Sequence, residues 1–512
     1  MAHVSGRELA ALADAVGWFS LPETERHEYE QLAEAVLDTV ALVTDAPLGG
    51  DDPGPTGEAR SVRRPTEADD PLNAIVHWAD VPPTGDGALS GMRIAVKDSV
   101  SVASVPMTLG SRILDDFRPR RDSVVAERIL AAGGRIVAAT NMDDFAFSGG
   151  GETSAFGPVR NPHDPRRAAG GSSGGSAAAL SYADRVDAAI GTDQGGSIRV
   201  PAAWCGFLGL KPTFGAVPYT GIVGIDATFD HVGPMARNVG DLGLLLLAIA
   251  GPHPSDPRQR GLSFDPATVA AALESTSSDF TGLRVGVVSE GFSDDDALRA
   301  GTSAAVRAVA ADLAGAGATV GPVSVPEHLQ GGGIAFAGFV EGMYASALGG
   351  GNGYGWSGRY DPDLAAALHR GLVERGDLLS PQIKLVAMLG ELLQRAESGG
   401  IYARAQNQRP ALRAGYDRAL ADVDVLLMPT VPFTAHAIEP ELGLSARALK
   451  GWAPLANCSP LNMTGHPAIS VPAATADGLP VGVMLIGRHG GDARLLDVAG
   501  RMERAFGWSG AR

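Results

Sequence analysis

Cysteines and long apolar runs are scarce in this sequence. Its two cysteines, Cys205 and Cys458, cannot build a disulfide framework, so a reducing, cytoplasmic compartment is expected. The longest apolar stretch, residues 242–250, is far shorter than the ~20 residues that a membrane-spanning helix requires. The N-terminus has no basic region followed by an apolar run, so we expect neither a secretory signal nor a membrane anchor.

Basic residues are also in deficit. Lys and Arg number 41 against 58 Asp and Glu, which gives a formal net charge of −17. A chain of this charge repels nucleic acids and anionic membrane surfaces, so neither is expected as a partner. The sequence has no HExxH motif and no paired CxxC motif, so it implies no metal site.

The first 70 residues differ in pattern from the rest. Apolar residues recur at helical spacing through 6–43, with a break at 17–22. Residues 47–70 are rich in Gly, Pro, Asp and Thr, which is typical of a linker. We therefore expect a helical appendage and linker at 1–70, suited to packing or to dimerisation as a homodimer. The main domain is expected at 71–512.

Strands alternate with helices along the main domain, which predicts an α/β domain with a parallel or mixed sheet. The expected strands are 92–96, 135–139, 188–191, 283–290, 423–428, 468–471 and 481–486. The expected helices are 124–132, 177–182, 242–249 and 295–316. The glycine-rich segment 331–355 is expected to be a loop, either one that covers substrate or a plain surface loop. Residues 361–409 are expected to form helices that cap the sheet.

Two glycine–serine clusters, at 170–176 and 195–197, are the candidate site. Glycine lets a backbone approach a ligand closely, and a serine hydroxyl can attack a carbonyl or relay a proton. The second cluster follows the expected strand 188–191, where α/β folds place ligand-binding loops. One serine could therefore attack, a second relay the proton, and a buried lysine accept it. Lys97 is the candidate lysine because it ends the expected strand 92–96.

The clusters admit other interpretations. A phosphate-binding P-loop requires a GK[ST] ending that neither cluster has. Residues 170–174 satisfy the G-x-S-x-G pattern of a nucleophile elbow, but a loop rather than a strand precedes them. Both clusters could also be flexible loops, although the position of the second one after a strand argues against this.

The segments around the clusters resemble the amidase signature family. GGSSGGSAAAL at 170–180 and GTDQGGSIRVPAAWCGFLGLKPT at 191–213 are similar to the signature itself. Further matches, in order, are AVKD at 95–98, FGPVRNP at 156–162, GPMARNVGDL at 233–242, LLMPT at 426–430, TGHPAISVPA at 464–473 and GLPVGVMLIG at 478–487. The resemblance covers about 71–505, and the wording DQGGSIRVPAAWCG looks especially like bacterial amidases associated with nitrile hydratases.

The resemblance implies an α/β/α sandwich around a mixed, largely parallel sheet and a serine amidohydrolase without a cofactor. It assigns Lys97 as base, Ser172 as bridging serine after a cis Gly171–Ser172 peptide bond, and Ser197 as nucleophile. The backbone N–H groups implied for the oxyanion hole belong to Gln194, Gly195, Gly196 and Ser197. The implied acyl pocket includes Phe147, Ser148 and Gly149, and Phe147 is either an apolar wall or plain core.

One departure from the family concerns spacing. Ser172 and Ser197 are 25 residues apart, one more than expected, so Ser173 remains an alternative bridging serine.

The implied reaction converts small aliphatic or aromatic carboxamides to carboxylic acid and ammonia through an acyl-enzyme. The alternatives are an amidotransferase A-type subunit for glutamyl-tRNA amidation, a hydrolase of hydrazides or anilides, and a catalytically silent binding module. Asp193 and Arg199 are expected to make structural contacts beside the nucleophile.

Overall fold

A computed structural model describes residues 4–17, 19–45, 60–114, 117–259, 261, 264–351, 353 and 355–507. The chain divides into two compact units, Met1–Thr56 and Gly57–Arg512. The boundary precedes residue 70 because β1 (Ser61–Arg63) pairs with β2 (Ile75–Val81) of the main sheet. Residues 47–59 of the expected linker 47–70 lie outside the described residues.

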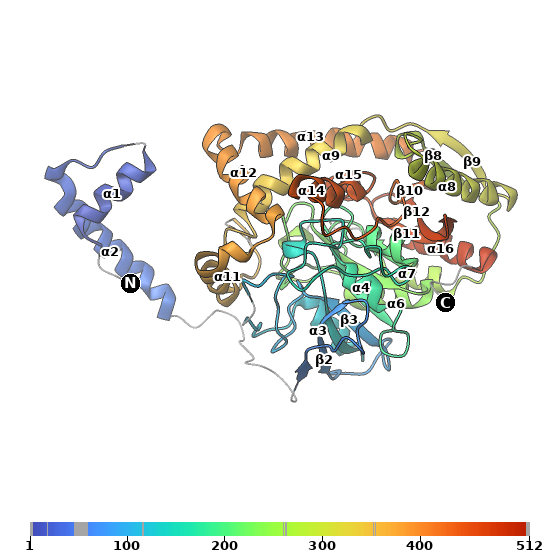
Figure 1. Cartoon of the computed structure of the whole chain (residues 1–512), viewed down its shortest axis with the longest axis horizontal. Helices are drawn as coiled ribbons and strands as arrows, with labels where there is room; N and C mark the ends of the chain where they lie inside the picture. The colour runs from blue at the N-terminus through green and yellow to red at the C-terminus, as the bar shows by residue number, and fades with distance from the viewer. Residues whose placement is uncertain are drawn as a thin grey trace. The chain divides into compact units, whose positions relative to one another are not determined.

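The first unit contains two helices, α1 (Gly6–Val16) and α2 (Arg26–Asp45), which pack on each other (Figure 1). Ser5 begins α1 with a capping box, because its hydroxyl accepts from the Glu8 N–H and Glu8 bonds back to the Ser5 N–H. Gly17 ends α1 with a φ of 74°, a conformation that glycine adopts easily. The expected helices and the break between them are confirmed.

A single mixed sheet forms the centre of the second unit. Its twelve strands in the described residues are ordered β1-β2-β4-β3-β5-β7-β6-β11-β12-β10-β8-β9. The strands after β2 are β3 (Arg93–Lys97), β4 (Arg135–Thr140), β5 (Ala188–Asp193), β6 (Leu208–Lys211), β7 (His231–Ala236), β8 (Arg284–Val288), β9 (Thr319–Val323), β10 (Val425–Pro429), β11 (Ala468–Ala476) and β12 (Leu479–Ile486). Parallel pairing is limited to β4-β3-β5 and β10-β8-β9, and the remaining neighbours are antiparallel, so the sheet is mixed, as expected, but has more antiparallel than parallel pairs.

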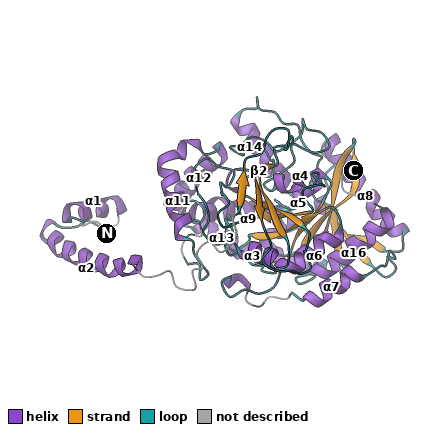
Figure 2. Ribbon diagram, turned by 90° about the horizontal axis from the view of Figure 1, so that it is seen from below, coloured by secondary structure: helices purple, strands orange, loops and turns teal. Residues whose placement is uncertain are grey.

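Helices cover both faces of this sheet (Figure 2), as an α/β/α sandwich requires. Ile190 of β5 packs into the cluster that contains α6 (Val239–Ile249), whereas its neighbour Ala189 packs into the cluster that contains α4 (Gly174–Ala179). This division follows from the two-residue period of a strand. The helices of the sheet faces are α3 (Val124–Ala131), α4 (Gly174–Ala179), α5 (Arg199–Cys205), α6 (Val239–Ile249), α7 (Pro266–Glu274), α8 (Ala297–Gly315) and α16 (Asp492–Phe506).

The glycine-rich segment 331–355 is largely helical, so the expectation of a loop was wrong for its first half. It contains most of α9 (His328–Ala337), a π-helical turn η5 (Gly338–Gly342) and α10 (Met343–Ala345). Two of its glycines allow close packing: a Cβ at Gly331 would lie 2.6 Å from Pro460, and one at Gly338 would lie 2.8 Å from Phe229. These two glycines therefore mark helix contacts rather than a flexible loop.

The remaining helices lie after this segment. They are α11 (Pro362–Arg375), α12 (Pro381–Glu397), α13 (Gly400–Ala419), α14 (Leu444–Trp452) and α15 (Ser459–Thr464). The expected helices at 361–409 are thereby confirmed. Among the described helices, none combines the length and apolarity that a bilayer crossing requires.

Candidate active site

Lys97 and the two glycine–serine clusters meet at one edge of the sheet. Lys97 is the last residue of β3, and the second cluster directly follows β5. Because β3 and β5 are parallel neighbours, their carboxyl ends lie at the same edge. The Ser173 N–H donates to the Ser197 carbonyl oxygen at 3.2 Å, which holds the two clusters side by side.

Lys97 is fully buried, and its amine contacts two hydroxyl groups. Its Nζ lies 2.7 Å from Ser172 Oγ and 2.8 Å from Thr192 Oγ1. Burial lowers the pKa of Lys97 from 10.5 to about 7, because desolvation disfavours the ammonium form. Surrounding carboxylates raise this pKa, but less strongly; they belong to Asp143, Asp193 and Asp230. A large share of Lys97 is therefore a neutral amine at neutral pH.

The two neighbouring serines of the first cluster face different partners. The Gly171–Ser172 peptide bond is cis, as predicted, and the Ser172 hydroxyl faces Lys97. The Ser173 hydroxyl instead donates to the Thr192 carbonyl oxygen at 3.0 Å and accepts from the Thr192 N–H at 3.2 Å. This geometry favours Ser172 over Ser173 as the bridging serine.

Asp193 fixes the loop that carries Ser197. Its carboxylate forms a fully buried ion pair with Arg199, with N–O distances of 2.9 and 3.0 Å. It also accepts from the N–H groups of Gly196 at 2.7 Å and Ile198 at 3.1 Å. Burial alone raises the pKa of Asp193, but the attraction and hydrogen bonds of Arg199 outweigh it and hold that pKa well below its usual range. The expected structural contacts of Asp193 and Arg199 are therefore present.

The ion pair extends into a buried network that joins distant parts of the chain. Asn462 donates to the carbonyl and carboxylate oxygens of Asp193, and its own oxygen accepts from Arg199 at 2.7 Å. Nearby, Lys211 Nζ contacts the His466 carbonyl oxygen at 2.6 Å and His231 Nε2 at 3.2 Å. Sequence reasoning did not identify Asn462 or Lys211, although GLKPT, with Lys211, lies within the quoted signature.

The amides after β5 differ in their availability. The Gly196 N–H is engaged by Asp193, whereas the N–H groups of Gln194, Gly195 and Ser197 have no hydrogen-bond partner among the described residues. Gly196 has a φ of 134°, and a Cβ there would lie 2.5 Å from that of Cys458. Glycine at this position thus serves the shape of the loop.

A small apolar cavity of about 20 Å³ adjoins Ser197. It is lined by Ala146, Phe147, Ser148, Gln194, Gly195, Ser197, Ile225, Phe339, Trp452 and Leu455. The Phe147 ring stands edge-on to Phe339 and Trp452, with centroid distances of 6.3 and 6.2 Å. Of the expected pocket residues, Phe147 and Ser148 line the cavity. Gly149 lies behind it, where a Cβ would meet Leu455 at 2.7 Å.

Several known proteins are similar to this chain. A sequence model described as Amidase matches residues 79–496. The chain is 40% identical over 484 residues to an enantioselective amidase of Rhodococcus rhodochrous, covering 93% of this chain and 92% of that one. It is 38% identical over 442 residues to the A-type subunit of glutamyl-tRNA(Gln) amidotransferase from Halobacterium salinarum, covering 85% and 100%. The solved peptide amidase of Stenotrophomonas maltophilia has a TM-score of 0.68 and 28% identity, with 83% and 84% covered.

The α/β fold and a site of this chemistry define a hydrolase that acts on acyl bonds. The chain belongs to the amidase family, because the family model spans most of it and relatives of high identity share nearly their whole length with it. It is accordingly an enzyme that hydrolyses amide bonds. The resemblance seen in the sequence motifs is confirmed, as is the predicted α/β fold.

Proposed function

We propose that Lys97, Ser172 and Ser197 form a catalytic triad that hydrolyses small carboxamides to carboxylic acid and ammonia. The observation that carries this proposal is the 2.7 Å contact between the buried Lys97 amine and Ser172 Oγ, beside Ser197 and its cavity. A neutral amine in that position can accept a proton, which an ammonium cannot.

The proposed reaction begins with a proton transfer from Ser197 to Ser172 and from Ser172 to Lys97. Ser197 Oγ attacks the amide carbon, and the resulting oxyanion accepts from the N–H groups of Gln194, Gly195 and Ser197. The proton returns through Ser172 to the leaving nitrogen, and ammonia departs from the acyl-enzyme. Water then attacks the ester, giving the net reaction R–CO–NH2 + H2O → R–COOH + NH3. We leave Gly196 out of the proposed donors because Asp193 already engages its N–H.

The cavity supports an apolar acyl group. Its walls include the rings of Phe147, Phe339 and Trp452 and the aliphatic side chains of Ile225 and Leu455. Apolar walls favour aromatic or branched aliphatic groups and disfavour a charged acyl chain, which would be desolvated without a partner. Simple aromatic and branched aliphatic carboxamides are therefore the proposed substrates.

A panel of amides tests this proposal. The purified chain, alone, is incubated with benzamide, isobutyramide, glutamine, a benzoic hydrazide and an anilide, and acid and ammonia (or the amine) are quantified. We expect equal amounts of acid and ammonia from benzamide or isobutyramide. If glutamine were the only compound hydrolysed, the result would favour an amidotransferase subunit, the type of protein to which the Halobacterium relative belongs. Release of no product from any compound would contradict the proposal.

The pH dependence of kcat/KM provides a separate prediction. Lys97 must be neutral to accept a proton, and burial lowers its pKa from 10.5 to about 7. The ammonium form predominates below that pH, so kcat/KM is expected to fall by about tenfold per unit well below pH 7 and to level off above it. A profile whose acidic limb lies near pH 10 would contradict a neutral Lys97 as base.

We also propose that the protein is a cytoplasmic homodimer that associates through its first unit. Leu32, Val36, Val40 and Val43 lie at helical spacing along α2 and are 46–74% exposed. Water exposure of such a stripe is unfavourable, and a second copy would bury it. Sedimentation equilibrium of the full chain tests the dimer, since a monomer at micromolar concentration would contradict it. The two free, buried cysteines accord with a reducing compartment, which cell fractionation tests.

A further inference from the structure

Lys97 makes a second hydrogen bond whose direction matters for catalysis. A neutral amine has two N–H groups and one lone pair, and a base must aim that lone pair at the proton it accepts. Thr192 Oγ1, at 2.8 Å from Nζ, can either accept from Lys97 or donate to the lone pair. Only the first arrangement leaves the lone pair available to Ser172, so the Thr192 proton must be directed elsewhere.

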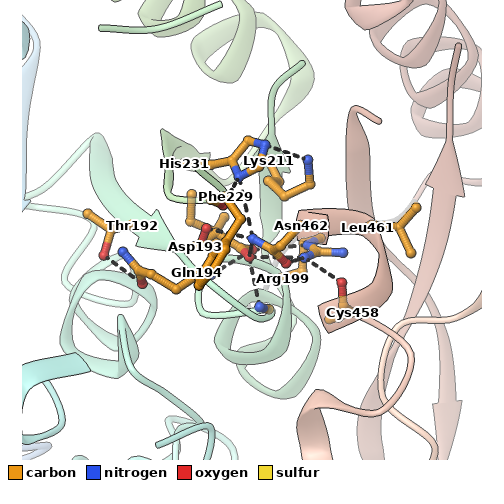
Figure 3. A network of polar contacts seen from close by, with 12 residues as sticks. Thr192, Asp193, Gln194, Arg199, Lys211, Phe229, His231, Cys458, Leu461 and Asn462 are labelled. Carbon is orange, nitrogen blue, oxygen red and sulfur yellow. Dashed lines mark hydrogen bonds and ion pairs between the residues drawn. The ribbon is translucent and has the colours of Figure 1, made fainter. Parts of the chain in front are cut away.

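The Gln194 side chain can accept a hydrogen bond from the Thr192 hydroxyl. Its Oε1 lies 3.3 Å from Thr192 Oγ1 (Figure 3) and can only accept, so the Thr192 hydroxyl donates to it. At the other end of the same amide, Gln194 Nε2 donates to the Tyr219 hydroxyl at 2.7 Å. The Tyr219 hydroxyl in turn donates to the Val223 carbonyl oxygen, at 3.5 Å.

The reverse direction is chemically possible but leaves a group unsatisfied. If the Gln194 amide turned over, Tyr219 would donate to Oε1, Nε2 would donate to Thr192, and Thr192 would donate to the Lys97 lone pair. The Val223 carbonyl cannot donate, and it accepts no other hydrogen bond among the described residues. The Val223 carbonyl therefore favours the direction in which Tyr219 donates to it, because that direction leaves the Lys97 lone pair free.

We propose that Thr192, Gln194 and Tyr219 form a directional hydrogen-bond chain that keeps the Lys97 lone pair aimed at Ser172. The inference rests on the proposed triad, and it makes the Thr192, Gln194 and Tyr219 side chains positioning residues. Two contacts fix the position of Tyr219: the Arg258 guanidinium lies 4.8 Å from its ring centroid, and the Tyr219 N–H donates to Asp256 at 2.7 Å.

Tyr219→Phe tests the chain because it removes only the hydroxyl that orients the amide. The rate measured is the phosphonylation of Ser197 by an alkyl fluorophosphonate, followed by mass spectrometry across pH. In this step the Ser197 O–P bond forms, the P–F bond breaks, fluoride leaves, and the serine proton passes through Ser172 to Lys97. The plateau rate is expected to fall about five- to tenfold, the effect of one lost hydrogen bond.

The acidic limb of the pH profile of the labelling rate distinguishes this effect from a structural defect, because the two would shift it in opposite directions. In Tyr219→Phe the reversed chain donates to the neutral amine and stabilises it, so the limb is expected to shift to lower pH. A loosened site would admit water and raise the pKa of Lys97 towards 10.5, shifting the limb to higher pH. The charged groups facing these side chains are unchanged by the substitution: Asp143, Asp193 and Asp230 around Lys97, and Asp230 and Arg258 around Tyr219.

Matched variants complete the test. Tyr182→Phe removes a comparable hydroxyl, bonded to Asp70 at 2.8 Å, and is expected to leave rate and limb unchanged. Thr192→Val is expected to slow the reaction, and Thr192→Ser to restore it.

If Tyr219→Phe kept the wild-type plateau rate and acidic limb, or if its limb shifted to higher pH, the proposed hydrogen-bond chain would be overturned. Absence of labelling at Ser197 in the wild type would overturn it together with the triad. Labelling without hydrolysis of any carboxamide would contradict only the proposed substrate.

Discussion

Ser197→Ala is expected to leave less than about a thousandth of the wild-type kcat for amide hydrolysis. The change removes the attacking oxygen and nothing else, since the Ser197 carbonyl still accepts from the Ser173 N–H. The side chain is 3% exposed and adjoins the apolar cavity, so alanine fits without a clash. Steady-state kcat, with circular dichroism as a check on folding, measures the effect.

Ser172 and Ser173 offer a matched comparison for this prediction. Ser172→Ala interrupts the path from Ser197 to Lys97 and is expected to lose activity on a similar scale. Ser173→Ala removes only hydrogen bonds to the Thr192 backbone, at 3.0 and 3.2 Å, and is expected to keep kcat within about tenfold. Equal losses in the two variants would contradict the assignment of Ser172, and wild-type turnover in Ser197→Ala would contradict the nucleophile.

The residues that converge on Lys97 could be predicted because they lie in two short glycine–serine motifs, the second of which directly follows a strand. The clusters at 170–176 and 195–197 carry their own glycines, so their sequence specifies the tight backbone that the site requires. Gly171 is an example, since a Cβ there would lie 1.8 Å from the Asp143 carboxylate. The position of Lys97 near the second cluster then follows from two parallel strands, β3 and β5, and the bond from the Ser173 N–H to the Ser197 carbonyl holds the first cluster beside the second.

The walls of the cavity could not be predicted in the same way. Phe339 and Trp452 reach the site from α9–η5 and α14, more than a hundred residues after Ser197, and no local pattern marks them as neighbours. The glycines of 331–355 suggest a loop because a sequence does not show what packs against a helix. β1, β2, β6, β7 and β9 were also missed: β6 has only four residues, and β7 contains both Gly233 and Pro234, which usually interrupt strands.

Buried charge, rather than apolar packing alone, holds the loop that carries Ser197 in place. Arg199 and Asp193 are both 0% exposed, and together they satisfy two backbone N–H groups, a carbonyl and an amide side chain. Such a pair stabilises little when compared with an apolar replacement of both members, but either member alone is costly to leave buried. We therefore expect a large loss of stability when only one member of the pair is replaced.

Asp193→Asn is expected to lower the free energy of unfolding by about 3–5 kcal/mol at pH 7. The substitution leaves the Arg199 guanidinium buried with only neutral acceptors, the Cys458 carbonyl and Asn462 Oδ1. The effect should depend on pH. The pKa of Asp193 in the folded protein lies below its ordinary value of 3.8, so its stabilisation is present above about pH 4 and is lost as the pH falls below that.

Urea unfolding of both proteins at pH 7 and at about pH 3 measures this difference. The deficit of Asp193→Asn should shrink at the lower pH, because there the wild type also loses part of the stabilisation from its carboxylate. Asp363→Asn is the control: its ion pair with Arg120 is 3.5 Å long and more than half exposed, so the change should cost less than about 1 kcal/mol. A deficit no larger than that of the control would show that the buried ion pair does not hold the loop. A deficit that is undiminished in acid would assign the stabilisation to neutral hydrogen bonds instead of to the charge of Asp193.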